Sequence, residues 1–330
     1  MSEIELLSLG DATLDVFIAP SESETLCQID TKECFIAFSY GEKIPVKSLE
    51  FSIGGNAANN AIGTGRLGIN SSAVLTLGDD TIARRIVEML ETETVDTSFV
   101  VQQPSTASNY NTVVTYGGER TIFTYKAPRS YEWPVKLPVA PWVYYTSMGD
   151  SFAPFQNHLV EWLVKNPGIK LGFNPGSRQL KAGVEALNAV LKLTSIIFIN
   201  REEAEGLTGF TASSGREKEL LQAVKNLGPK VCVVTDGGNG SYVTDGQKFL
   251  HAGILPIDAY ERTGAGDAFG SGCLAAIIKG KSLEEALLWG TLNSASVIGY
   301  TGSQKGLLRE TDIPVWIERA KSSGVGVKEI

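Results

Sequence analysis

Short apolar runs that alternate with amphipathic stretches constrain the fold of this chain more than any other feature. Six runs have the length and composition of buried strands, at residues 4–10, 72–77, 142–147, 170–173, 195–199 and 230–235. Helical periodicity follows several of them, at residues 57–67, 82–90, 155–165, 184–191 and 217–227. Because parallel strands need crossover helices that bury both faces of the sheet, the pattern predicts an α/β fold with a mostly parallel sheet between two helical layers.

Two segments interrupt this alternation. Residues 17–53 contain no convincing helix, and residues 106–125 read as two strands around the pair Gly117-Gly118, which is typical of a hairpin. We interpret the interruptions, at about residues 16–52 and 106–128, as one small β-sheet inserted in a single core that spans residues 1–330. The first segment is longer than a simple strand pair needs, and the sequence does not explain its extra length.

Bulk properties exclude several classes of function. The net charge of −8 argues against a nucleic-acid partner, which would require a basic face. Residues 286–304 carry no charge but contain too many polar side chains for a membrane span. Glu3 and Glu5 stand where a secretory signal would be positive, so we expect a cytoplasmic protein. The four cysteines lack the spacing of a zinc site.

The segment Gly264-Ala265-Gly266-Asp267 precedes an apolar run that can form a helix. Backbone N–H groups at a helix start have no intrahelical partner, and small residues let an anion approach them closely. A carboxylate in the same turn could accept the proton of an attacking hydroxyl. This arrangement is suited to phosphoryl transfer, although an acid is also common at helix starts because it complements the helix dipole.

A second motif lies about two hundred residues earlier, where Gly54-Gly55 is followed by Asn59. Together the two motifs resemble the ribokinase-like family of sugar and nucleoside kinases, also called the PfkB carbohydrate kinases. The resemblance covers nearly the whole chain. It implies a ribokinase-like three-layer α/β/α sandwich whose small β-sheet acts as a lid over the substrate, with a homodimer formed through the lid as a further expectation.

The resemblance also implies roles for individual residues. Asp267 would be the general base, and Gly264, Ala265 and Gly266 would form the anion hole. The acceptor would be bound by Asp15, Gly54, Gly55 and Asn59. The nucleotide would be bound by Asn200, Thr235, Gly237, Gly240 and Asn293. Glu203 would hold magnesium through water, and Glu261 stands where many relatives carry an Asp that helps to hold potassium.

Other interpretations of these residues stay open at this point. Asp15 could be an ordinary loop acid after the strand at residues 4–10, and Glu203 a helix-start acid. Gly63, Gly65 and Gly68 match a dinucleotide-binding pattern, but they lie within and after a helix instead of opening one, so we expect them to let that helix pack closely on the sheet.

The predicted function is ATP- and Mg²⁺-dependent phosphorylation of a sugar or nucleoside hydroxyl, with K⁺ activation left open because Glu261 and Arg262 depart from the family pattern. Two alternatives remain. The first is a kinase for a phosphorylated sugar, because Arg120, Lys126 and Arg129 lie near the hairpin. The second is a non-catalytic sugar- or nucleotide-binding protein of the same fold. The sequence alone does not identify the acceptor.

Overall fold

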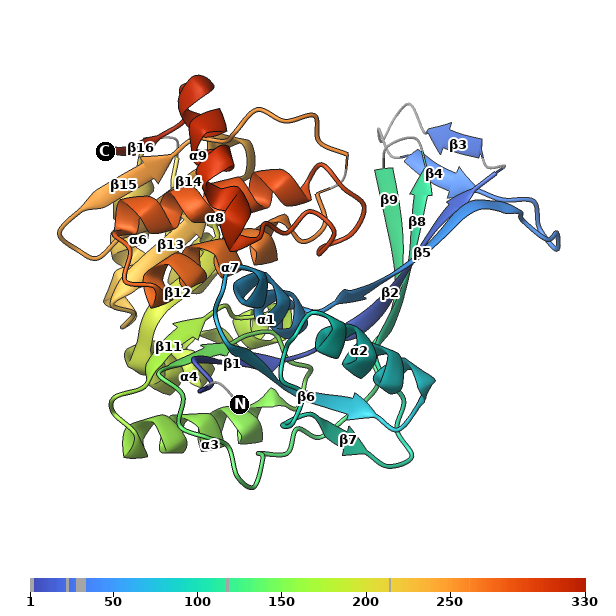
Figure 1. Ribbon diagram of the computed structural model, residues 1–330, viewed down its shortest axis with the longest axis horizontal. Helices are drawn as coiled ribbons and strands as arrows, with labels where there is room; N and C mark the ends of the chain where they lie inside the picture. Colours follow the sequence, from blue (N-terminus) through green and yellow to red (C-terminus); the bar gives the residue numbers. More distant parts are fainter. Residues whose placement is uncertain (1–2, 22–23, 28–33, 117–118, 214, 261) are drawn as a thin grey trace.

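The computed structural model describes residues 3–21, 24–27, 34–116, 119–213, 215–260 and 262–330. Within these residues the centre of the molecule is a large sheet (Figure 1). Its strands, from one edge to the other, are β16 (Val327–Glu329), β15 (Phe249–Ala252), β14 (Ser241–Thr244), β13 (Val231–Thr235), β12 (Thr194–Asn200), β11 (Lys170–Phe173), β10 (Trp142–Tyr145), β1 (Leu6–Gly10), β6 (Ser71–Gly78) and β7 (Val101–Gln103).

Seven neighbouring strands of this sheet, from β13 to β7, run parallel, and they include all six strands predicted from the apolar runs. β14, β15 and β16 extend the sheet in antiparallel orientation. None of these three strands was predicted: β14 and β15 are short and follow β13 without an intervening α-helix, and β16 has only three residues and is separated from β15 by α7, α8 and α9.

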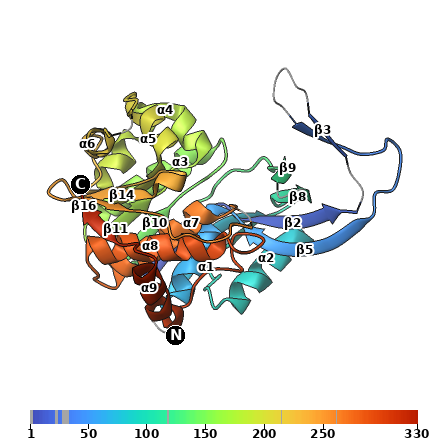
Figure 2. The same ribbon diagram turned by 90° about the horizontal axis from the view of Figure 1, so that it is seen from above.

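Helices cover both faces of the sheet, as predicted (Figure 2). The α-helices are α1 (Asn56–Arg66), α2 (Thr81–Thr92), α3 (Phe152–Lys165), α4 (Ser177–Leu193), α5 (Arg201–Thr208), α6 (Glu217–Asn226), α7 (Ala265–Ile278), α8 (Leu283–Val297) and α9 (Ile313–Ser322). Alternation along β10 shows why both faces are apolar. Val143 and Tyr145 pack with α3 and α4, whereas Trp142 and Tyr144 pack with α7 and α8.

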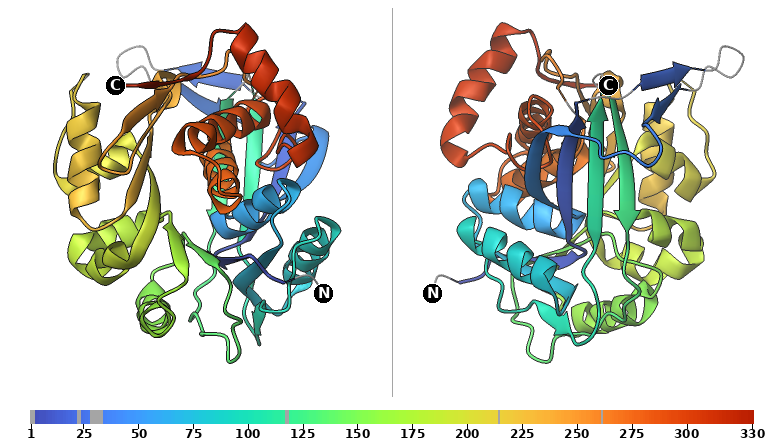
Figure 3. Two further views of the ribbon diagram at one scale, coloured as in Figure 1. Left: turned by 60° about the vertical axis from the view of Figure 1, so that its left-hand side comes forward. Right: turned by 90° about the vertical axis from the view of Figure 1, so that its right-hand side faces the viewer.

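A small sheet projects from one side of the core (Figures 1 and 3). Its strands, in order, are β5 (Val46–Gly54), β2 (Thr13–Pro20), β8 (Tyr110–Tyr116) and β9 (Glu119–Tyr125). β8 and β9 form the predicted hairpin, although Gly117 and Gly118 lie outside the described residues. A separate pair, β3 (Glu24–Cys27) and β4 (Cys34–Ala37), accounts for the extra length of the first segment.

One packing expectation needs correction. Gly63 lies in α1, and a Cβ atom there would approach the Ser271 Oγ of α7 to 2.3 Å. The glycine therefore permits close contact between two helices instead of contact between a helix and the sheet. Among the described residues, no helix combines the length and the apolar character needed to cross a membrane.

Candidate active site

A cavity of about 510 Å³ lies between the start of α7, the end of α8 and the turn after β13. Its lining combines glycines and small polar groups at one end with apolar side chains at the other. The residues are Thr235, Gly237, Gly238, Gly240, Ser241, Gly253, Ile254, Leu255, Pro256, Ile257, Ala259, Arg262, Ala265, Gly266, Phe269, Thr291, Ser294, Ala295 and Ile298. Such a cavity can hold a planar apolar ring together with an anionic tail.

The predicted anion hole lies at the wall of this cavity. Gly264 precedes the first residue of α7 and has a φ of 77°, a conformation that favours glycine. Ala265 and Gly266 follow in the first helical turn and line the cavity. A Cβ atom on Gly266 would meet no other atom within 4 Å, so an anion could come close to the backbone there.

Asp267 follows directly in the same turn and is only partly accessible to solvent. Its Oδ2 accepts a hydrogen bond of 2.8 Å from the Asn59 Nδ2 of α1. The pKa of Asp267 is raised to about 6, chiefly by burial. The Asn59 hydrogen bond opposes this rise, and the negative charge of Glu203 adds to it. A carboxylate with a pKa near neutrality is suited to act as a general base.

A second, smaller cavity of about 170 Å³ lies at the carboxyl end of β1, beneath the small sheet. Almost all of its lining side chains are polar. The residues are Asp11, Ala12, Thr13, Gly55, Asn56, Asn109, Asn111, Lys126 and Ser147. The buried Thr13 hydroxyl has no hydrogen-bond partner in the described part of the chain, which leaves it available to a ligand.

Asp11 is held in place in this smaller cavity. Its Oδ1 accepts a hydrogen bond of 2.8 Å from the hydroxyl of Tyr131, which itself accepts one of 2.6 Å from the Gly149 N–H. Burial raises the pKa of Asp11, and the bond from Tyr131 opposes this. The carboxylate keeps further acceptor capacity for a ligand hydroxyl.

Asp267 is related to both cavities through its neighbours, although it is not among the lining residues of either. It is adjacent in sequence to Gly266, which lines the larger cavity, and it is hydrogen-bonded to Asn59, one turn after Asn56, which lines the smaller one.

Of the predicted acceptor residues, Gly55 lines the smaller cavity, whereas Asp15, Gly54 and Asn59 are not among its lining residues. Asp15 lies within strand β2 of the small sheet instead of in a loop after the core strand. It is buried, and its Oδ1 accepts a hydrogen bond of 2.8 Å from the Asn111 Nδ2 of β8. A Cβ atom on Gly54 would come within 2.2 Å of Asp15, and one on Gly55 within 2.5 Å of the Asp11 carbonyl, so both glycines permit close approach.

Asn200 and Glu203 form a reciprocal cap at the start of α5. The Asn200 Oδ1 accepts from the Glu203 N–H at 2.8 Å, and the Glu203 Oε2 accepts from the Asn200 N–H at 2.9 Å. Burial raises the pKa of Glu203. The helix-start interpretation of Glu203 is therefore correct, and its negative charge also raises the pKa of Asp267.

Of the predicted nucleotide residues, Asn200 caps α5 and is not among the residues that line the larger cavity, and the other four divide into two groups. Thr235, Gly237 and Gly240 line the larger cavity. Asn293 is fully buried behind its wall, where it donates to the Ala268 carbonyl at 2.8 Å and accepts from the Leu308 N–H at 2.8 Å. The α8 side chains that reach the cavity include Thr291 and Ser294 instead. Glu261, the predicted cation ligand, lies outside the described residues.

Sequence reasoning missed most of the smaller cavity. Asp11 stands four residues before Asp15 and directly follows a predicted strand, a position where ligands collect in open α/β sheets, so this signal could have identified it. Asn109 and Asn111 carry no comparable signal. Of the cations near the hairpin, Lys126 lines the cavity, whereas Arg129 donates to the Thr76 and Ala107 carbonyls.

Comparisons with known proteins agree on one family. The model of the pfkB family carbohydrate kinases matches residues 24–310. A 6-phosphofructokinase of Thermoanaerobacterium thermosaccharolyticum is 26% identical over 280 residues, which cover 81% of this chain and 85% of that enzyme.

Solved structures show the same fold. A ribokinase of Arabidopsis thaliana, complexed with ribose and ATP, superimposes with a TM-score of 0.77 at 21% identity, covering 96% of this chain and 99% of that one. A putative ribokinase II of E. coli, in complex with ATP and Mg²⁺, gives a TM-score of 0.76 at 20% identity, covering 96% and 99%. The predicted ribokinase-like fold is thereby confirmed.

Proposed function

The chain belongs to the pfkB family of carbohydrate kinases, which phosphorylate hydroxyl groups, and from this premise we propose that it transfers the γ-phosphoryl group of ATP to a sugar hydroxyl held beside Asp267. The observation that supports the proposal is that Asp267 directly follows Gly266 of the glycine-lined cavity and is hydrogen-bonded to Asn59, one turn from Asn56 of the polar cavity. The adenine ring would lie against Phe269 and Ile298, and the phosphates would point toward α7.

Asp267 takes the proton from the acceptor hydroxyl while the hydroxyl oxygen forms its bond to the γ-phosphorus of ATP. The bond between that phosphorus and the bridging oxygen breaks, and ADP leaves. The N–H groups of Ala265 and Gly266 stabilise the negative charge on the transferred group, and such preorganised donors are often worth about 3–4 kcal/mol each. The small sheet acts as a lid that excludes water, which would otherwise compete with the sugar.

The residues present fit magnesium carried by ATP. The described residues contain no cluster of three or more acidic, histidine or cysteine ligands, but magnesium in kinases needs only one or two carboxylates besides phosphate oxygens and water. Glu203 would hold a water molecule bound to the magnesium ion, because the helix cap uses only the Oε2 of its carboxylate. Magnesium supplies charge neutralisation at the phosphates when bound.

The acceptor cavity favours a small polyhydroxyl compound. Among the residues that the structure describes, no aromatic side chain lines it, whereas bases are usually held by stacking on aromatic or apolar groups. Asp11, Asn109 and Asn111 offer hydrogen bonds to several hydroxyls, with Asp15 behind Asn111.

A specific observation supports a phosphorylated or carboxylated sugar as a second candidate. Lys126 lines the cavity, and within the described part of the chain its ammonium group has no ion-pair partner. An anionic group of the acceptor could supply that partner.

We expect ADP release with ATP and Mg²⁺ to depend on a sugar and to be at least tenfold slower with adenosine or cytidine, because the acceptor cavity offers no stacking surface. The assay would compare ribose, fructose, 2-keto-3-deoxygluconate, fructose 6-phosphate and the two nucleosides, each with and without K⁺. Faster turnover with an anionic sugar than with ribose or fructose would select the second candidate. Preference for a nucleoside would contradict both.

A second proposal concerns assembly: one face of the lid sheet pairs with the same face of a second chain. Strand register brings Phe51, Val16, Thr112 and Phe123 into one row across the four strands. The side chains at the ends of this row, Phe51 and Phe123, are 42% and 61% exposed, and Leu49 on the same face is 55% exposed. Between them Val16 is buried and Thr112 is polar, so the exposed apolar side chains lie toward the two edges of this face. Exposed apolar side chains gathered on one face are typical of an interface.

Light scattering after size-exclusion chromatography tests this arrangement. We expect the wild-type protein at about twice the chain mass of 35.4 kDa and Phe123→Lys at the mass of one chain, because a charge would be buried in the interface. Ile122→Lys is the matched control, since Ile122 neighbours Phe123 on the opposite face of β9 and is 43% exposed. A wild-type mass of one chain would refute the dimer.

A further inference from the structure

Asn59 is bound to the base and not to the acceptor cavity. Its side chain is only 3% exposed, and it is not among the residues that line the smaller cavity. Its Nδ2 lies 2.8 Å from the Asp267 Oδ2 and donates to it, which links α1 to α7 across 208 positions of the chain. A buried amide committed in this way acts on the carboxylate before it can act on a ligand.

The other end of the Asn59 amide is fixed by two donors. Its Oδ1 accepts from the Ser303 Oγ at 2.9 Å and from the Gln304 Nε2 at 3.1 Å. Because the carbonyl oxygen satisfies these donors, the NH₂ group must face the carboxylate of Asp267. The rotated amide would bring two oxygens together at Asp267 and leave both donors without an acceptor.

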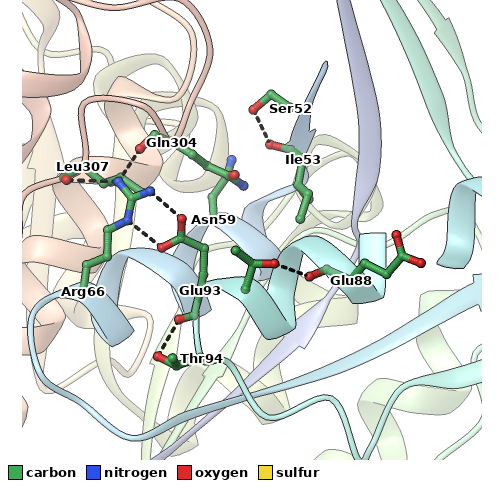
Figure 4. A network of polar contacts seen from close by, with 10 residues as sticks. Ser52, Ile53, Asn59, Arg66, Glu88, Glu93, Thr94, Gln304 and Leu307 are labelled. Carbon is green, nitrogen blue, oxygen red and sulfur yellow. Dashed lines mark hydrogen bonds and ion pairs between the residues drawn. The ribbon is translucent and has the colours of Figure 1, made fainter. Parts of the chain in front are cut away.

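The segment that carries these donors is itself attached to α1 (Figure 4). Arg66 donates from Nη1 to the carbonyls of Gln304 at 2.7 Å and Leu307 at 3.2 Å. Its Nε and Nη2 form a paired contact with the Glu93 carboxylate at 2.8 and 2.7 Å. Asn59 and Arg66 lie seven positions apart, on the same side of α1. The helix therefore carries both Asn59 and the arginine that holds the segment of its donors.

We propose that Asn59 is a positioning residue for the catalytic base: Ser303 and Gln304, held by Arg66, fix its amide so that it donates to Asp267 and orients the carboxylate toward the acceptor hydroxyl. The assignment rests on the proposed function, in which Asp267 is the base.

The charged surroundings of Asp267 determine what the loss of this bond would do. Burial and the Glu203 carboxylate of α5 raise the pKa of Asp267, and the Asn59 bond lowers it. The charge of Asp267 in turn raises the pKa of the buried Tyr144 of β10, which stays neutral. Removing the Asn59 donor therefore raises the pKa of Asp267, because a hydrogen bond to the charged form is lost.

A titration that needs no substrate can detect this. The full-length protein would be labelled with ¹³C at the aspartate carboxyl carbons and followed by NMR between pH 4 and 9, with Asp267→Asn identifying the resonance. We expect the midpoint of Asp267 to rise by about one pH unit in Asn59→Leu, which is the size expected for losing one hydrogen bond to a charged group.

Asn60→Leu is the matched control. Asn60 is the next residue of α1 and is equally buried, but it accepts from Ser8 instead of contacting the base, so the midpoint should not move. Asn59→Ala removes the same donor with a smaller side chain, should raise the midpoint as Asn59→Leu does, and decides the question if Asn59→Leu does not fold.

An unchanged midpoint in a folded Asn59→Leu or Asn59→Ala protein would overturn the assignment. Sugar kinetics separate this failure from failure of the proposed function. If Asp267→Asn is inactive but Asn59→Leu only raises the KM for the sugar, the base assignment stands and Asn59 is an acceptor ligand. If Asp267→Asn remains active, the base assignment fails, whatever the titration shows.

Discussion

Replacing Asp267 with asparagine is expected to lower turnover at least about a hundredfold while ATP binding persists, because a lost general base typically costs this much or more. The substitution keeps the size of the side chain and leaves Ala265 and Gly266, which line the nucleotide cavity, unchanged. The measurement is ADP release with the best sugar of the acceptor comparison, together with calorimetric titration of ATP and Mg²⁺.

The pH dependence provides an independent check of the same assignment. Since a base acts in its deprotonated form and the pKa of Asp267 is raised to about 6, wild-type kcat/KM should increase as the pH rises through about 6 and then level off. Turnover of Asp267→Asn near the wild-type rate would contradict the role of Asp267 as base. Loss of ATP binding in this variant would instead indicate a structural defect at the start of α7.

The parts of the fold that were predictable are those with a strong local signal. The six predicted parallel strands are apolar on both faces because helices cover both sides of the sheet. They can therefore be recognised in the sequence as continuous apolar runs, such as residues 195–199. β16 at the edge of the sheet has only three residues, and its pairing with β15 depends on contacts between distant parts of the chain. No local pattern encodes such pairing.

The same distinction applies to the site. The small residues before Asp267 are adjacent in sequence, so their combination was visible. An amide suits a ligand and a buried network equally well, so the partners of the two amides could not be read from the sequence. In the structure Asn59 donates to Asp267, and Asn293 binds the Ala268 carbonyl and the Leu308 N–H.

Replacing Gly264 with alanine is expected to lower turnover strongly as well. A Cβ atom there would lie 2.3 Å from the Ser303 Cβ, in addition to the strain of a φ of 77° for any other residue. Either α7 or the segment around Ser303 must shift, and both carry parts of the site: the N–H groups of Ala265 and Gly266 on one side, and the donors to Asn59 on the other. We therefore expect Gly264→Ala to lower turnover at least about a hundredfold, the usual effect of losing one preorganised donor.

Gly280→Ala separates this effect from backbone strain alone. Gly280 lies just beyond the other end of α7 with a φ of 73°, but a Cβ atom there would meet nothing within 4 Å. It should cost about 1–2 kcal/mol of stability, the penalty of the left-handed conformation, and leave turnover unchanged. Thermal unfolding and steady-state turnover of both variants make the comparison. Equal turnover of the two variants would mean that the close approach of Gly264 to Ser303 is dispensable. The proposed anion hole would then not depend on this contact between the start of α7 and Ser303.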